Sequence, residues 1–135
     1  MADAPAGALV ARLLHGGLAA GLVIFGAACY ALRGGRPPGG LPGFVAWIPL
    51  GLAAVVFPAA VALRGRLFQE PSAAPTDWWQ AHLTHAVLLW SLFEGPALFG
   101  AAIYLATGRG LALAATAAGL ALLILHAPDR LRDVQ

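Results

Sequence analysis

The sequence predicts an all-α protein, a four-helix transmembrane bundle. Of the 135 residues, 60% are apolar and 10% are charged, and the mean hydropathy is +0.79. Soluble domains carry about 25% charged residues, so this composition excludes an ordinary soluble domain. The apolar residues gather into four segments, each near the roughly 20 residues that a helix needs to cross the hydrocarbon core of a bilayer. We therefore expect a single transmembrane domain over residues 1–135.

The first two apolar segments predict a helical hairpin. The first helix covers residues 8–32, with Arg12 as its one charge, and the second covers residues 44–63. Residues 33–40 between them combine glycines, prolines and arginines. Such a stretch predicts a loop because proline and glycine end helices.

The last two segments predict a second hairpin. The third helix covers residues 78–107 and the fourth covers residues 111–127. A predicted loop over residues 65–76, which contains Pro71 and Pro75, precedes the third helix. The short Gly-Arg-Gly turn at residues 108–110 predicts that the last two helices are antiparallel neighbours.

The arginines predict how the bundle is oriented. In the predicted topology more of them lie on the side of the two termini (Arg12, Arg64, Arg66, Arg130 and Arg132) than on the opposite side (Arg33, Arg36 and Arg109). Because basic residues are enriched on the cytoplasmic side, we expect both termini in the cytoplasm and the protein in a bacterial inner membrane. The net charge of +2 is too small to indicate nucleic acid, so the expected surroundings are a lipid bilayer and other membrane subunits.

Small residues and a proline predict how the helices pack. Gly17 and Gly21 form a G-x-x-x-G step in the first helix, and such a step lets two backbones approach closely in lipid. Pro96 lies inside the third helix, where it lacks an amide donor and crowds the preceding turn, so we expect a kink there. The small faces predict a close-packed bundle and also offer room for a helix of another subunit.

Glu94 is the one carboxylate inside a predicted span, about midway along the third helix. An ionised carboxylate at that depth costs several kcal/mol, so we expect it to be protonated, paired, or directed toward water or protein. Three interpretations stay open for Glu94: a carrier of protons or other ions, a polar contact to another subunit, and a neutral structural carboxyl.

Residues 94–104, Glu-Gly-Pro-Ala-Leu-Phe-Gly-Ala-Ala-Ile-Tyr, resemble the ion-carrying helix of rotary ATP synthase c subunits, in which small residues follow a carboxylate. The last two helices also resemble those of small uncharacterised four-helix bacterial membrane proteins, which end in a histidine beside a proline and charged residues, as residues 126–130 do. The resemblance implies a membrane-embedded carboxyl at Glu94. It does not extend to the first helix, which lacks the glycine ladder of a c subunit, and Pro96 departs from a ring helix.

Four histidines are predicted near the same leaflet. His15 lies in the first turns of the first helix, His82 and His85 lie in those of the third, and His126 ends the fourth. Histidines at matching depth on facing helices can ligate haem or a metal, so His15 with His82, or His85 with His126, are candidate haem ligands. The alternative interpretation is a set of interfacial histidines without a ligand.

The motifs that the sequence lacks help to choose among the possible function classes. No serine-nucleophile, zinc-protease or phosphate-loop motif occurs, which argues against a hydrolase or a nucleotide-dependent enzyme. We expect a small accessory or scaffold subunit of a larger membrane complex, of an energy-converting kind. The alternatives are proton or ion translocation through Glu94, and electron transfer by a haem- or pigment-binding protein that uses the histidines.

Overall fold

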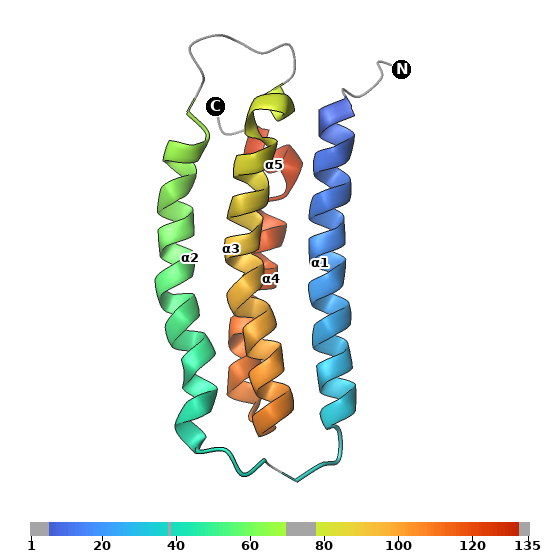
Figure 1. Ribbon diagram of the computed structural model, residues 1–135, viewed down its shortest axis with the longest axis vertical. Coiled ribbons are helices and arrows are strands. Elements are labelled where there is room, and N and C mark those ends of the chain that lie inside the picture. The colour runs from blue at the N-terminus through green and yellow to red at the C-terminus, as the bar shows by residue number, and fades with distance from the viewer. Residues whose placement is uncertain (1–5, 38, 70–77, 133–135) are drawn as a thin grey trace.

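The computed structural model is all-α and describes residues 6–37, 39–69 and 78–132. Its elements are α1 (Ala6–Arg33), η1 (Gly43–Trp47), α2 (Ile48–Leu67), α3 (Trp78–Thr107), η2 (Gly110–Ala112), α4 (Leu113–Leu125) and α5 (Pro128–Arg132), where η marks a 3-10 turn. The four longer helices lie side by side along one axis (Figure 1). We call the end at which α1 and α3 begin and α2 ends the upper end of the bundle, and the opposite end the lower end.

Three helical segments of the described ranges are long and apolar enough to cross a membrane: Ala6–Arg33, Gly43–Leu67 and Trp78–Thr107. The third has the predicted bounds, and the first exceeds them slightly at both ends. The second helix continues to Leu67. Gly65 and Arg66, where the sequence predicts a loop, therefore belong to its last turn.

The fourth apolar segment differs from the prediction of one helix over residues 111–127. It consists of η2, the 13-residue α4, and a break at His126 and Ala127. Pro128 explains the break, because proline is unfavourable in the interior of a continuing helix. It is favourable at the first position of a new helix, which is where it lies in α5. The α4 helix is therefore shorter than a full span, and α5 continues its path toward the upper end (Figure 1).

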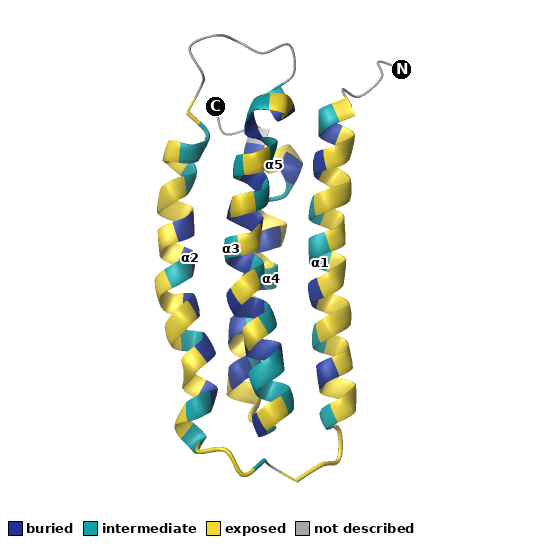
Figure 2. Ribbon diagram, in the orientation of Figure 1, coloured by how far each residue is buried: buried dark blue, intermediate teal, exposed yellow. Residues whose placement is uncertain are grey.

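The core of the bundle is built around α3. In their most apolar stretches, 44% of the residues of α3 are buried, against 17% for α1 and 28% for α2. Both outer helices bury a single stripe and expose the rest (Figure 2). The buried stripe of α1 recurs at helical spacing in Ala8, Ala11, Leu22 and Cys29. Many of the buried side chains are small, which lets the helices approach closely.

Two glycines let η2 and α4 lie close against α3. A Cβ atom on Gly119 would lie 2.5 Å from the Cβ of Ala97 and 2.7 Å from the carbonyl oxygen of Phe93. A Cβ atom on Gly100 would lie 2.6 Å from the carbonyl oxygen of Ala112. The hydroxyl of Thr116 donates a 2.7 Å hydrogen bond to the carbonyl of Ala97 across the same contact. The missing side chains of the two glycines are thus what lets the last two helices pack as an antiparallel pair.

The outer surface of the bundle is apolar. Large apolar side chains on three different elements are mostly exposed, among them Val55 (70%), Ile24 (68%) and Phe44 (67%). An apolar surface of this extent has no favourable partner in water, and it indicates contact with a lipid bilayer. Arg12 and Arg33 lie 21 residues apart on α1, or about 31 Å along a helix, which matches the roughly 30 Å of a hydrocarbon core.

Candidate functional site

The break between α4 and α5 lies inside the bundle, where side chains of α1, of α3 and of His126 itself donate hydrogen bonds to backbone carbonyls at the end of α4. The Nε1–H of Trp90 donates a 2.8 Å hydrogen bond to the carbonyl of His126. The Nε2 atom of His15 lies 2.9 Å from the carbonyl oxygen of Leu123. The Nδ1 atom of His126 lies 2.9 Å from the carbonyl oxygen of Leu122. Because a carbonyl only accepts hydrogen bonds, each of these imidazole nitrogens carries the proton and donates it.

These hydrogen bonds have a plain physical reason. The carbonyls of Leu122 and Leu123 also accept the backbone N–H of His126, at 3.0 and 3.2 Å, so the two imidazoles add second donors there. The carbonyl of His126 accepts from the Trp90 indole, and leaving it unsatisfied in an apolar environment would cost several kcal/mol. We call His15, Trp90 and His126, which cap the end of α4, the capping cluster. The ring of His15 meets that of Trp90 edge to face at a centroid distance of 5.0 Å, and the ring of His126 lies 4.9 Å from that of Phe93.

An ion pair ties the same region to α1 nearer the upper end. Arg12 contacts the carboxylate of Asp129 at 2.7 Å, and both side chains are more than half exposed. Exposed pairs contribute little, so Arg12→Gln is expected to lower the free energy of unfolding by no more than about 1 kcal/mol. Unfolding in detergent micelles measures this. A larger loss would mean that the pair, and not the capping cluster, holds α5 in place.

A second cluster lies between the upper ends of α2 and α3. The ring of His82 stacks on that of Trp78 at 4.2 Å and on that of Phe68 at 5.8 Å. The ring of His85 meets that of Phe68 edge to face at 6.5 Å and lies 6.4 Å from that of His82. The Nδ1 atom of His82 donates to the carbonyl of Trp78 over 2.9 Å. We call Phe68, Trp78, His82 and His85 the upper aromatic cluster.

The four predicted histidines therefore divide into two groups. His15 and His126 belong to the capping cluster, whereas His82 and His85 belong to the upper aromatic cluster. Each predicted haem pair, His15 with His82 or His85 with His126, combines one histidine from each of the two groups. The Nε2 atom of His15 donates to the carbonyl of Leu123 on α4 and is not directed at His82. Within residues 6–37, 39–69 and 78–132, no group of three or more histidine, cysteine or acidic side chains is placed to hold a metal ion.

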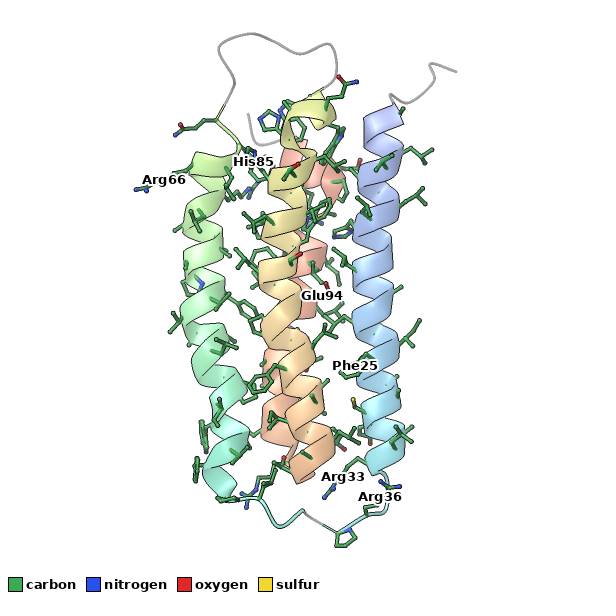
Figure 3. The ribbon with its side chains drawn as sticks, viewed as in Figure 1. Phe25, Arg33, Arg36, Arg66, His85 and Glu94 are labelled. Carbon is green, nitrogen blue, oxygen red and sulfur yellow. The ribbon has the colours of Figure 1, made fainter. Side chains whose placement is uncertain are left out.

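Glu94 lies on the side of α3 that faces α1, about halfway along the bundle (Figure 3). Its side chain is half-buried, and it makes no hydrogen bond or ion pair with any residue that the structure describes. Its neighbours Ser91 and Gly95 are exposed on the outside of α3. We call Ser91, Glu94 and Gly95 the Glu94 face.

The glycine step of α1 lies at nearly the same depth. Contacts of His15 with Trp90 and of Arg33 with the carbonyl of Leu105 fix the register of the two parallel helices, and they place Glu94 level with residues 19–22. A Cβ atom on Gly17 or on Gly21 would meet nothing within 4 Å. The glycines that pack helices together inside this chain are Gly100 and Gly119 instead, so Gly17 and Gly21 leave an open surface on α1.

Pro96 is buried within α3, and the helix continues past it to Thr107. The sequence did not predict the roles of Trp90 and Phe68 in these clusters. Trp90 had one usable signal, because an indole N–H in the middle of an apolar helix needs an acceptor. Phe68 follows the last residue of α2, and its backbone N–H donates to the carbonyl of Arg64.

No protein-family model matches this chain, and it has no match among curated proteins or solved structures. The resemblance of residues 94–104 to a c-subunit helix thus stays a prediction. The geometry of the chain itself has to carry any functional argument.

Proposed function

We propose that this chain is an integral membrane protein of four membrane-embedded segments that serves as an accessory or scaffold subunit of a larger membrane assembly. The observation that carries this proposal is the position of Glu94. A carboxyl group lies at mid-depth of an apolar bundle, half-buried, without a partner in the described part of the chain. A partner subunit that supplies a hydrogen-bond donor would remove the free-energy cost of an unpaired carboxyl group in this apolar environment.

The energetic argument favours such a contact. A charged side chain at the centre of a bilayer costs at least about 2.5 to 3.5 kcal/mol, and a neutral polar group without a hydrogen bond also costs free energy there. Ionisable residues in membranes are therefore expected to face protein or water rather than lipid. The half-buried position of Glu94 gives a neighbouring helix direct access to it.

The small residues around Glu94 support the same reading. Gly95 adjoins the carboxyl on α3, and Gly17 and Gly21 leave open surface on α1 near the same depth. Association of helices in lipid depends on close backbone approach and on hydrogen bonds between helices, because lipid provides no hydrophobic drive. The Glu94 face combines the half-buried carboxyl with the exposed Ser91 and Gly95 beside it.

Translocation of protons by the isolated chain has less support. A carrier needs groups that exchange protons on both sides of the carboxyl. Between Glu94 and Thr107, α3 carries a single polar side chain, Tyr104, and its ring stacks on that of Tyr30 at 6.0 Å. A haem protein has less support for a different reason, since His15 and His126 cap the end of α4.

Replacement of Glu94 tests the proposal. Native mass spectrometry of gently extracted protein is expected to find wild-type chain with partner subunits, and Glu94→Leu is expected to weaken the association about three- to thirty-fold, the range of interhelical hydrogen bonds in membranes. Glu94→Gln, which keeps a donor and an acceptor, is expected to retain most of it. Asp129→Asn is the matched control, since it removes a carboxylate at the upper end of the bundle.

Two results would contradict the proposal. One is that the wild-type chain leaves its own membranes without other subunits. The other is that Glu94→Leu keeps its partners while proton flux through reconstituted vesicles is lost, which would shift the role of Glu94 to ion transfer.

A further inference from the structure

A groove of about 250 Å³ lies between α1 and α4 and opens to the outside of the bundle. Its walls include Leu22, Gly26 and Ala27 of α1 and Leu113, Ala117 and Leu120 of α4. Glycine and alanine at these positions leave the space that larger side chains would fill. Because a cavity of about 150 Å³ holds a benzene molecule, the groove has room for a stretch of hydrocarbon chain.

The side chains that line the groove present apolar groups to it. The one polar residue among them is Thr116, and its hydroxyl donates a 2.7 Å hydrogen bond to the carbonyl of Ala97 on α3. The methyl group of Thr116 is turned toward α1, because a Cβ atom on Gly26 would lie 3.7 Å from it. The acyl chain of a lipid therefore matches this groove better than a polar ligand does.

Arg33 lies at the lower mouth of the groove. A Cβ atom on Gly108, in the turn that follows α3, would lie 2.5 Å from a terminal nitrogen of Arg33. This contact and the one between Gly26 and Thr116 give nearly the same antiparallel register of α1 against the chain from Gly108 into α4. The register sets the guanidinium of Arg33 just below Leu113, where the groove ends.

Backbone carbonyls hold the half-buried side chain of Arg33 in place. Its Nη1 atom donates to the carbonyl of Leu105 over 3.4 Å, and its Nη2 atom donates to the carbonyl of Pro37. Each of these nitrogens carries two N–H groups, so one N–H on each lacks an acceptor among the residues that the structure describes. The guanidinium is thus positioned in advance and keeps donors for an anionic group.

The lower end of the bundle is positively charged. Arg36 is exposed, its backbone N–H donates to the carbonyl of Arg33 at 3.1 Å, and both arginines lie at the lower end of α1 (Figure 3). Arg109 adds a third charge, with its guanidinium against Gly43 at the start of η1. The sequence contains no aspartate or glutamate over residues 4–69 or 95–128, and every element at the lower end belongs to these stretches. Groups outside the chain therefore balance these charges.

We propose that the groove binds one anionic phospholipid, with an acyl chain between α1 and α4 and the phosphate at Arg33 and Arg36. Arginine suits phosphate oxygens, and basic sites between transmembrane helices bind anionic headgroups. Arg33 lies about one hydrocarbon thickness from Arg12, so the mouth of the groove falls at headgroup depth. The inference is independent of the proposed partner contact, because α1 and α4 form the groove whereas Glu94 belongs to α3.

Two lipids and two arginine variants test the headgroup part of the proposal. In maltoside micelles, native mass spectrometry is expected to show tighter binding of phosphatidylglycerol than of phosphatidylcholine, whose choline group cancels the phosphate charge. Arg36→Gln is expected to weaken phosphatidylglycerol binding about fivefold, the contribution of one arginine near a membrane surface, and to leave phosphatidylcholine binding unchanged. Arg66→Gln removes an exposed arginine at the upper end and is expected to change either affinity less than about twofold, because salt screens charges at that distance.

Two adjacent alanines of α4 test the groove itself. Ala117 and Ala118 are both exposed, but only Ala117 lines the groove. Ala117→Phe places a ring in the space of the acyl chain, so it is expected to weaken binding of both lipids at least about fivefold. Ala118→Phe, the matched control, is expected to change binding less than about twofold. An unchanged unfolding transition in the same micelles shows that each variant keeps the fold.

The outcomes separate the parts of the proposal. Loss of phosphatidylglycerol in Arg36→Gln, together with loss of both lipids in Ala117→Phe, supports it. Equal binding of the two lipids by the wild-type chain, or no binding of either, overturns the headgroup site, and equal binding by Ala117→Phe and Ala118→Phe overturns the groove. A protein subunit that gently extracted complexes lose in Ala117→Phe but keep in Glu94→Leu would assign the groove to a partner helix instead.

Discussion

Replacement of Gly119 by valine is expected to destabilise the bundle by about 3 kcal/mol, the upper part of the range for overpacked cores. A Cβ atom at this position would lie 2.5 Å from the Cβ of Ala97, 2.7 Å from the carbonyl oxygen of Phe93 and 3.3 Å from the ring of Phe57. The Phe93 oxygen belongs to the backbone of α3 and cannot move aside without shifting that helix. The free energy of unfolding, from denaturant titration in mixed micelles, measures the effect.

A glycine of α2 provides the control for this substitution. A Cβ atom on Gly51 would meet nothing within 4 Å, so Gly51→Val is expected to change the unfolding free energy by less than about 1 kcal/mol. Gly119→Ala should fall between the two valine variants. Equal stability of Gly119→Val and Gly51→Val would mean that α4 does not pack against α3 through Gly119.

Replacement of Trp90 by phenylalanine is expected to cost about 1 to 3 kcal/mol from the hydrogen bond alone. The variant keeps an aromatic ring but loses the N–H that donates to the carbonyl of His126, and that carbonyl has no intrahelical partner. Trp90 is fully buried, so the smaller ring adds a packing loss. Unfolding in the same micelles gives the total.

The control for this variant is Trp47→Phe. Trp47 lies in η1 and is 62% exposed. Trp47→Phe therefore makes the same chemical change without leaving a buried acceptor unpaired. A similar loss in the two variants would assign the effect to general aromatic packing in lipid. A loss confined to Trp90→Phe supports the capping cluster as the device that holds the end of α4 inside the bundle.

The long helices follow from the sequence because their signals are local. Continuous apolar stretches longer than about 20 residues, separated by glycine- and proline-rich breaks, leave few alternatives to spanning helices. The end of α4 at Leu125 could not be predicted from the sequence, because residues 111–127 are largely apolar and only Pro128 indicates a break. A break at that point depends on donors from other helices, His15 and Trp90, and such contacts are not visible in a local pattern.

The candidate residues show the same division. The depth of Glu94 is a matter of helix rise, so the sequence places it in the middle of α3 correctly. The surroundings of the histidines depend on helix rotation and on which helices are neighbours, and spacing along one helix does not give these. Gly17 and Gly21 illustrate the limit, because a glycine step predicts close approach but not whether the approaching helix belongs to the same chain.

Site-specific photocross-linking in native membranes tests the central claim most directly. A photoreactive side chain at Ser91, on the Glu94 face, is expected to form a discrete protein adduct, and the adduct should be lost when Glu94→Leu is added. The same side chain at Val55, which is 70% exposed on α2, is the reference for a surface that meets lipid. Lipid adducts alone at Ser91, or equal protein adducts at Ser91 and Val55, would contradict a partner subunit at Glu94.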